Sequence, residues 1–237
     1  MTIFAKIRFG YSATMIALIL GALMIPLSAL FRSRASSIMH RFNRAIIYAI
    51  GGRIDVVGTR DERADLFLFN HQGIIDIIAM EASENLPWRW VAKKEVFTIP
   101  LYGKLLTLGD MIPVERENKS SLISLLKYVK ESKETLHRPV VIAPEGTRAK
   151  GQKLLPFKAG ANLVATKLKL RVQPVVITGS KALLNEHDRT AHFGVTVRII
   201  YLPAFDAADA PKDWYEQVKR DMQAVIDEEY QRYGRER

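Results

Sequence analysis

The pattern of hydrophobic and polar positions changes at Gly51-Gly52. Before this pair, the 23 residues from Phe9 to Phe31 carry no charge, and residues 36–50 place apolar side chains at helical spacing. After the pair, short apolar runs alternate with amphipathic stretches and turn residues. We therefore expect two N-terminal helices within residues 1–52 and one region, 53–237, in which strands and helices alternate.

Seven apolar runs in the second region have the length and composition of strands. They cover residues 53–58, 65–70, 88–93, 111–115, 139–144, 172–179 and 193–203. Several are too apolar to have an exposed face, which is typical of strands buried on both faces. Helices are predicted after His71, after Glu95, between Asn118 and Leu136, between Lys158 and Lys169, and from Pro211 to Tyr233. The fold class is α/β: a single domain with a mixed, mostly parallel sheet flanked by helices, preceded by an N-terminal membrane-anchoring helical segment.

The uncharged stretch is long enough to cross a bilayer. A helix rises about 1.5 Å per residue, so 23 residues span roughly 34 Å. A cleaved signal peptide is disfavoured, because its apolar core would be shorter and followed by a small-x-small site, whereas this stretch meets Arg32 at once. The second segment is amphipathic, with His40 on its basic face. Both a spanning helix with an interfacial partner and a monotopic anchor in one leaflet fit this pattern.

Charge supports a membrane surface as the partner. The chain has 35 Lys and Arg against 25 Asp and Glu, for a net charge of +10. Residues 1–60 hold eight of these basic residues and Asp55 alone among the acids, so this end carries +7. The remaining body is nearly balanced, which argues against nucleic acid as a partner. More basic residues follow the apolar stretch than precede it, and the positive-inside rule then places the large C-terminal region on the cytoplasmic side of the membrane.

Cysteine is absent, which excludes disulfides, thiolate metal sites and a cysteine nucleophile. The sequence contains no Walker A motif and no G-x-G-x-x-G motif, so the usual nucleotide phosphate cradles are missing. His187 and His192 lie near Asp188, but a third ligand in pattern is lacking, and a solvated turn is the better interpretation. The pattern implies no metal and no organic cofactor.

One histidine stands where a general base would be expected. His71 follows the apolar run at 65–70, and Asp76 comes five residues later, in the first turn of a predicted helix. A carboxylate at this spacing can accept a hydrogen bond from the imidazole, fix its tautomer and stabilise its charged form. The alternative is a histidine that caps a helix whose first turn contains an aspartate, and the spacing alone favours that alternative.

A second loop offers groups that suit a phosphate. The strand at 139–144 runs into Glu145, Gly146, Thr147 and Arg148. An arginine beside backbone amides matches phosphate oxygens bidentately. A β-turn with a solvated pair of Glu145 and Arg148 is the equally weighted alternative.

Basic residues also follow two other predicted strands. Lys93 and Lys94 end one strand, and Arg116 follows another. Such positions would converge on one edge of the sheet, near His71 and Arg148. Solvated surface charges are the alternative.

Taken together and in this order, four segments resemble the glycerolipid acyltransferase family, and within it the lysophosphatidate acyltransferases (1-acylglycerol-3-phosphate O-acyltransferases). They are NHQGIID at 70–76, AKKEVFTIPLYGKLLTLGDMIPVER at 92–116, APEGTRAKGQKLLPFKAGA at 143–161 and VQPVVI at 172–177. The resemblance covers about half of the chain. Two departures are Gly73, where many members have Ser or another polar residue, and Ala143, where many have Phe.

The resemblance implies a reaction and a set of roles. A fatty acyl group would pass from acyl-CoA or an acyl carrier protein thioester to the sn-2 hydroxyl of lysophosphatidic acid, giving phosphatidic acid for phospholipid biosynthesis. His71 would be the general base, oriented by Asp76. The residues implied for binding the acceptor are Lys93, Arg116, Glu145, Gly146, Thr147 and Arg148. Apolar residues of 99–109 would line an acyl-chain tunnel.

Two other functions stay open at this point. In the first alternative, the protein is an acyltransferase whose acceptor is a different lyso-lipid, such as a lyso-ornithine lipid or another lysophospholipid. In the second, the protein is a non-catalytic lipid-binding protein of the membrane surface. All three functions have membrane phospholipids as partners.

Overall fold

The computed structural model describes residues 3–115 and 119–234, and its centre is one mixed sheet. The strands lie in the order β1 (Arg53–Val57), β9 (Thr196–Tyr201), β6 (Arg171–Thr178), β2 (Leu66–Phe69), β5 (Val140–Ile142), β3 (Arg89–Lys93) and β4 (Ile112–Val114). From β6 to β4 all neighbours are parallel, while β9 is antiparallel to β6. The short strand β10 (Phe205–Asp206) also pairs with β6, antiparallel. This confirms the predicted fold class, and all seven predicted strands are present.

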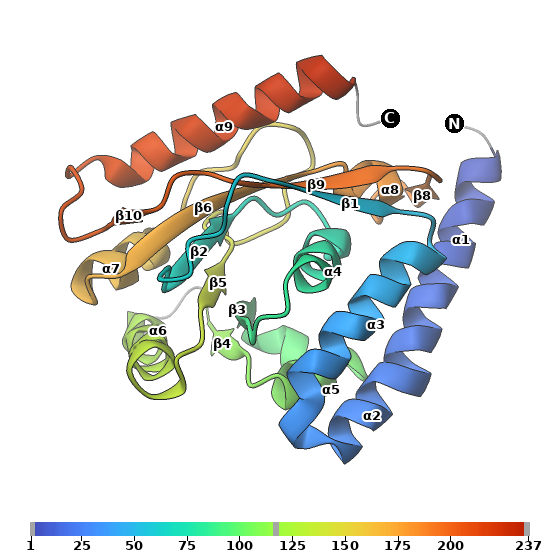
Figure 1. Cartoon of the computed structure of the whole chain (residues 1–237), viewed down its shortest axis with the longest axis horizontal. Helices are drawn as coiled ribbons and strands as arrows, with labels where there is room; N and C mark the ends of the chain where they lie inside the picture. The colour runs from blue at the N-terminus through green and yellow to red at the C-terminus, as the bar shows by residue number, and fades with distance from the viewer. Residues whose placement is uncertain (1–2, 116–118, 235–237) are drawn as a thin grey trace.

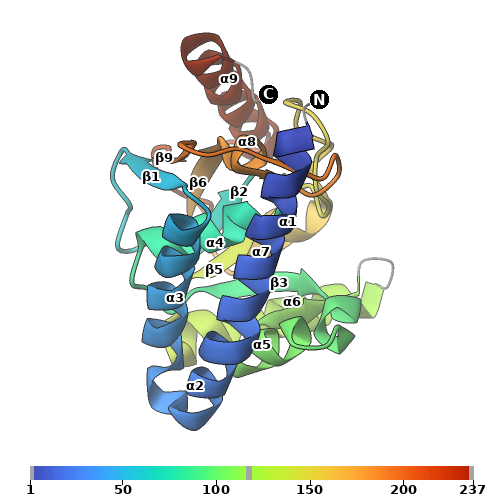
Figure 2. The same ribbon diagram turned by 90° about the vertical axis from the view of Figure 1, so that its right-hand side faces the viewer.

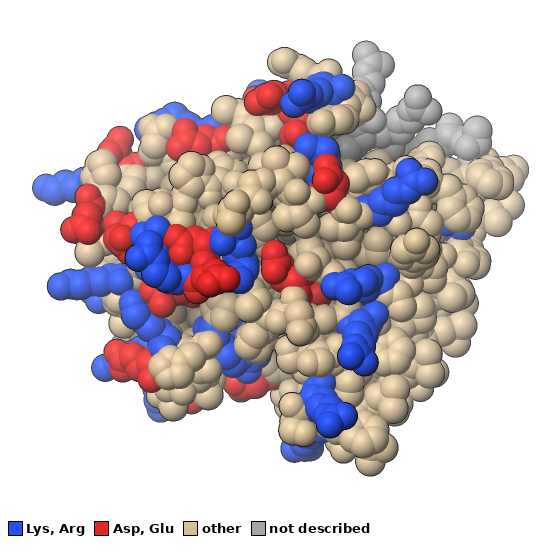
Figure 3. Space-filling model, in the orientation of Figure 1, with Lys and Arg blue, Asp and Glu red and all other residues tan. Residues whose placement is uncertain are grey.

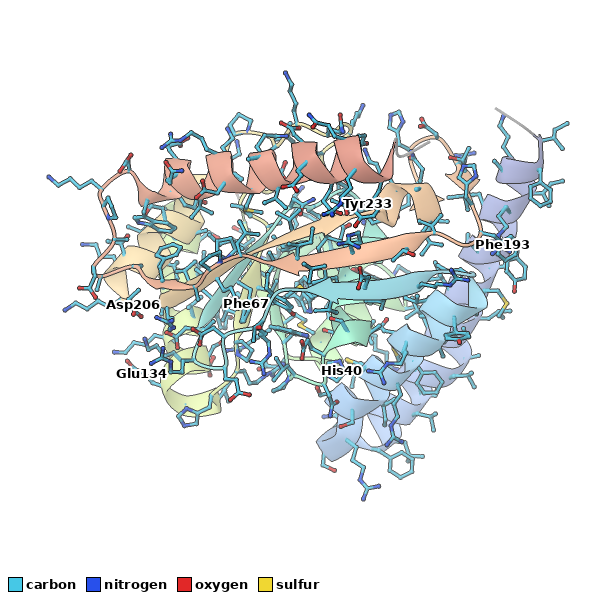
Figure 4. All side chains as sticks on the ribbon, turned by 45° about the horizontal axis from the view of Figure 1, so that its top comes forward. His40, Phe67, Glu134, Phe193, Asp206 and Tyr233 are labelled. Atoms are coloured by element: carbon cyan, nitrogen blue, oxygen red, sulfur yellow. The ribbon has the colours of Figure 1, made fainter. Side chains whose placement is uncertain are left out.

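Apolar side chains cover both faces of the sheet, which explains the continuous hydrophobic runs. Along β2, Phe67 and Phe69 enter one core, and Leu66 and Leu68 enter the other. The first core lies under α3 and α4, and the second lies under α9 and α7, as Figure 1 shows. Phe67 is fully buried at the middle of the sheet (Figure 4).

Helices α4 (Ile74–Ser83), α5 (Tyr102–Leu108), α6 (Lys119–Glu131), α7 (Ala159–Lys167), α8 (Ser180–Leu183) and α9 (Trp214–Tyr233) complete the body. The stretch after Glu95 first forms a 3₁₀ turn, Lys94–Thr98, before α5 begins. A π-helical turn, Ser132–Leu136, follows α6. Strands β7 (Leu184–Asn185) and β8 (Thr190–Ala191) form a small antiparallel hairpin, in the segment that the sequence predicted to be a loop.

The N-terminal helix is longer than the uncharged stretch. It runs from Ile3 to Leu30 as α1 (Ile3–Leu18), a π-helical turn (Ile19–Met24) and α2 (Ile25–Leu30), with mean hydropathy high enough for a membrane span. Pro26 lacks an N–H, and the π turn before it accommodates the lost hydrogen bond. Arg8 is a charged residue within this apolar helix. Its side chain is buried against the body, where the guanidinium donates a hydrogen bond to the carbonyl of Ile50 at 2.7 Å.

The continuous helix formed by α1 and α2 lies side by side with α3 (Ala35–Ala49) along the body (Figure 2). Ile16 and Ile19 of the first helix and Ile46 of α3 belong to the same core as the sheet. The outer face of α1 keeps large apolar side chains exposed, including Ile3, Phe4 and Ile7. The N-terminal segment is therefore packed on the body along one stripe and apolar on the opposite one.

The predicted position of His40 on a solvated basic face is wrong. His40 is buried between α3 and α4, where Nδ1 lies 2.9 Å from Oε2 of Glu81 and 2.8 Å from its carbonyl oxygen (Figure 4). Glu81 also accepts a hydrogen bond from the indole of Trp90 at 2.6 Å. Helical spacing placed His40 beside the arginines, but a distant carboxylate on α4 made its burial favourable.

Candidate active site

The parallel strands β2, β5, β3 and β4 end at one edge of the sheet, and the candidate site lies along this edge. His71 comes two residues after β2, and Asp76 lies in the first turn of α4. Nδ1 of His71 is 2.9 Å from Oδ2 of Asp76, and the Asp76 side chain is fully buried. The imidazole is mostly buried but still accessible from solvent, with 15% of the side chain exposed.

Asp76 both caps the helix and orients the histidine. Its Oδ2 accepts from the backbone N–H of Gln72 at 2.6 Å and of Gly73 at 2.8 Å, in addition to His71. An oxygen with two such amide donors is an acceptor, so Nδ1 of His71 carries the proton and Nε2 keeps the lone pair. The helix cap is therefore Asp76 and not His71, and the same carboxylate also accepts a hydrogen bond from the imidazole.

Asn70 and Phe69 fix the turn that carries the histidine. The amide side chain of Asn70 donates to the carbonyl of Ile177 at 2.8 Å and accepts from its N–H at 2.7 Å, which ties the end of β2 to β6. The ring of Phe69 lies 5.4 Å from the imidazole ring. His71 thus stands on a strand end that is tied to the neighbouring strand, and such rigidity is what accurate placement of a side chain requires.

Glu145 is a buried brace between two loops. Its Oε1 accepts from the backbone N–H of His71 at 3.1 Å, and its Oε2 accepts from that of Leu155 at 2.7 Å. Burial raises the pKa of Glu145, while these two hydrogen bonds oppose the rise. The side chain points into the protein, so it shapes the loop of Gly146 and Thr147 rather than facing solvent.

Arg148 is held at the same edge by an ion pair with Glu186, a residue that the sequence pattern did not indicate. Its Nη1 donates to Oε2 of Glu186 at 2.9 Å, and the same oxygen accepts from the N–H of Ile74, the first residue of α4, at 3.0 Å. Glu186 belongs to the segment predicted to be a solvated turn, and its contacts come from residues far away in the sequence. Local pattern carries no signal for such a bridge.

The charges of Arg148 and Glu186 both act on the phenol of Tyr102. Burial raises the pKa of Tyr102, with Arg148 lowering it and Glu186 raising it further. Tyr102 begins α5, directly after Leu101, which holds a left-handed backbone conformation with φ of 65°. The stretch 99–109 thus supplies a phenol to the edge as well as apolar residues.

Lys93 lies on the same edge, two strands away from His71. It ends β3, which is separated from β2 by β5, and its ammonium pairs with Glu95 at 3.0 Å. Arg116 lies outside the described residues. It follows β4, whose last residue, Val114, is in register with Lys93.

Two other features stand apart from this edge. His187 pairs with Asp188 at 2.9 Å on the exposed tip of the hairpin, and the described residues contain no cluster of three His, Asp or Glu that could hold a metal. A hollow of about 600 Å³ lies between α9 and the ends of β1 and β9. Its Arg198 pairs with Asp55 and, at 2.8 Å, with Glu229, so its charges largely neutralise one another.

Comparison with known proteins decides the family. A family model described as Acyltransferase matches residues 53–178, which include His71, Asp76, Glu145 and Arg148. The chain belongs to the acyltransferase family. Over 174 residues this acyltransferase is 40% identical to the 1-acyl-sn-glycerol-3-phosphate acyltransferase of Helicobacter pylori, and the match covers 73% of both chains.

More distant relatives carry the same description. Human 1-acyl-sn-glycerol-3-phosphate acyltransferase beta is 31% identical over 184 residues, which cover 74% of this chain and 66% of the human one. The coconut enzyme is 32% identical over 143 residues, but the match spans only 46% of its length. The crystal structure of the 1-acyl-sn-glycerophosphate acyltransferase PlsC from Thermotoga maritima has the same fold, with a TM-score of 0.75 at 20% identity over 98% of this chain and 97% of that one.

Proposed function

We propose that this acyltransferase transfers a fatty acyl group from a thioester to the sn-2 hydroxyl of lysophosphatidic acid and so makes phosphatidic acid. The observation that carries the proposal is a histidine and buried aspartate pair at the start of α4, with an arginine bridged to the same helix end. The relatives, including one that is 40% identical, are acyltransferases named for the same acceptor, which supports the proposal.

His71 acts as the general base. Its Nε2 takes the proton of the acceptor hydroxyl while the oxygen attacks the thioester carbonyl. The carbon–sulfur bond then breaks, and the leaving thiolate takes a proton from the imidazolium. Asp76 orients the ring and stabilises its positive charge. Acyl transfer is direct in this mechanism, which suits a chain without cysteine.

The acceptor's phosphate binds on the basic side of the edge. Arg148 offers a guanidinium that is about half exposed, from a loop braced to His71 by the buried Glu145. Lys93 adds a second positive charge on this edge, and Gly146 and Thr147 present the loop backbone. Arg116, which comes two residues after β4 in the sequence, remains a proposed phosphate ligand. Holding the phosphate fixes the distance between the acceptor hydroxyl and His71, and such placement supplies a large share of catalysis.

The acyl chain follows apolar side chains of α5. Leu105 and Leu108 pack against Met24 and Met39, which places this helix between the active-site edge and the N-terminal helices. The donor is acyl-CoA or an acyl carrier protein, both of which are anionic and suited to a basic surface.

The protein is associated with a membrane through its N-terminal helices. One stripe of α1 packs on the body along most of its length, so a bilayer crossed by this helix would also have to contain α3 and the hairpin. We therefore favour a monotopic anchor, with the exposed apolar stripe in one leaflet. Exposed arginines of this segment follow α3 on a face with few acids (Figure 3), and they favour the anionic cytoplasmic surface.

An acceptor panel tests the proposed function. The purified, detergent-solubilised protein is supplied with acyl-CoA or acyl carrier protein donors and with lysophosphatidic acid, lysophosphatidylcholine or a lyso-ornithine lipid. Phosphatidic acid as the main product is the expected result. Preference for an acceptor without a phosphomonoester would contradict the proposal, and binding to lipid vesicles without any turnover would indicate a lipid-binding protein instead.

A further inference from the structure

Glu186 joins two parts of the site that no sequence motif connects. One of its oxygens accepts from both Arg148 Nη1 and the Ile74 amide, at 2.9 and 3.0 Å. Ile74 begins the helix whose first turn holds Asp76. The carboxylate therefore ties the proposed phosphate-binding arginine to the helix that orients the general base.

Arg148 needs such a tie to bind a phosphate at a defined place. It lies in an exposed loop with 47% of its side chain accessible, and a free arginine there would sample many rotamers. The contact with Glu186 uses Nη1, while a guanidinium carries five N–H donors in a planar fork. Nε and Nη2 together form an edge that matches two phosphate oxygens.

The hairpin that carries Glu186 is firmly packed on the body of the protein. The hairpin that carries it places Leu184 and Ala191 in the main core, together with Ile16 and Ile19 of the N-terminal helix. Gly73 leaves room for the carboxylate, because a Cβ at that position would lie 3.3 Å from Oε2 of Glu186. The side chain is one-third exposed, so it borders the site rather than filling the core.

We propose that Glu186 is a positioning residue that aims Arg148 at the phosphate of the acceptor. The inference rests on the proposed function, because it assumes a phosphate-bearing acceptor. The helix N-terminus and the guanidinium together neutralise the carboxylate, which limits its repulsion of the phosphate. Loss of Glu186 leaves Arg148 present but misdirected, so binding of the acceptor weakens while the proton transfer at His71 continues.

Steady-state kinetics of Glu186→Gln and Glu186→Ala test this role. A hydrogen bond to a charged group corresponds to about a 10- to 100-fold effect, so KM for lysophosphatidic acid is expected to rise about tenfold or more in Glu186→Ala and less in Glu186→Gln. The kcat and the KM for the acyl donor should change less than about threefold. Asp188→Asn, on the same hairpin but paired with His187 and Asn185 of the hairpin itself, is the matched control and should behave as the wild type.

A double-mutant cycle separates positioning from a merely structural role. If Glu186 acts through the arginine, Glu186→Ala should raise KM for lysophosphatidic acid no further in an Arg148→Ala background. Melting temperatures show whether each variant folds, and Glu186→Gln keeps the test open if the alanine variant does not. Additive effects, an unchanged KM or a loss confined to kcat would overturn the inference.

Two results distinguish failure of the positioning role of Glu186 from failure of the proposed function. A lower KM in Glu186→Gln would mean that the carboxylate competes with the phosphate, which overturns the positioning role alone. A wild-type protein that does not acylate lysophosphatidic acid would refute the proposed function, and the inference with it.

Discussion

Replacing Asp76 with asparagine should lower kcat strongly and the stability of the fold only slightly. In the wild type, one fully buried oxygen accepts from His71 Nδ1 at 2.9 Å and from the amides of Gln72 and Gly73 at 2.6 and 2.8 Å. Asparagine has nearly the same shape but no charge. The N–H groups of Gln72 and Gly73 hold its oxygen in the place of Oδ2, so His71 keeps an acceptor but loses the negative charge that stabilises its imidazolium form.

The size of the effect follows from the charge pair. His71 becomes positive as it takes the acceptor's proton, and removing one partner of a buried charge pair costs about 3–5 kcal/mol. Because about 1.4 kcal/mol corresponds to a factor of ten, kcat should fall about 10²- to 10⁴-fold. The free energy of unfolding should fall by only about 1 kcal/mol, because the amide oxygen of asparagine still caps α4.

Initial rates with purified protein in mixed micelles, together with melting curves, measure both quantities. KM for lysophosphatidic acid should stay within about threefold, because Arg148 is bridged by Glu186 and not by Asp76. Asp227→Asn, an exposed carboxylate of α9, is the control and should keep wild-type rates. A variant of Asp76 that keeps more than about a tenth of kcat would refute the assignment of this carboxylate to catalysis.

Three further predictions concern packing, the membrane and pH. Gly103→Ala should destabilise the start of α5 by several kcal/mol, because its Cβ would lie 1.9 Å from the main-chain oxygen of Phe97, and limited proteolysis within 94–108 would detect the loss. Ile7→Ser on the exposed stripe of α1 should lower partitioning into vesicles about tenfold without lowering the melting temperature, whereas Ile123→Ser on α6 should leave partitioning unchanged; equal partitioning of both would contradict the anchor. Burial lowers the pKa of His40, but the hydrogen bond and charge of its carboxylate partner raise it more, so the net folded-state pKa lies above the unfolded value of about 6.5. The pair then stabilises the fold fully below about pH 6.5 and loses this contribution as pH rises through the folded-state pKa. The melting temperature of His40→Gln should therefore fall less than that of the wild type between pH 6 and 9, and parallel curves would refute this.

Much of the fold was predictable because local pattern determines it. Strands such as β2 are buried on both faces, so every position is apolar and the run stands out in the sequence. His71 and Asp76 are five residues apart at a strand end, and a strand followed by a helix brings them together without help from the rest of the chain. These features depend on short-range geometry, which a single sequence carries.

The contacts that the sequence did not reveal are between distant segments. Glu186 meets Arg148 and Ile74 only because the hairpin folds back against α1, and His40 is buried only because Glu81 of α4 faces it. A charged residue paired across the fold has the same local pattern as a solvated one. Its burial is decided by a partner whose position depends on the complete tertiary structure.

The most direct test of the account compares acyl transfer to lysophosphatidic acid by the wild type, His71→Ala and His137→Asn. His137 is exposed and in the left-handed backbone region that asparagine tolerates, so its variant controls for loss of a histidine as such. We expect phosphatidic acid from the wild type and from His137→Asn, and at least a hundredfold less from a folded His71→Ala. Comparable product from His71→Ala would contradict the claim that His71 is the base of this acyltransferase.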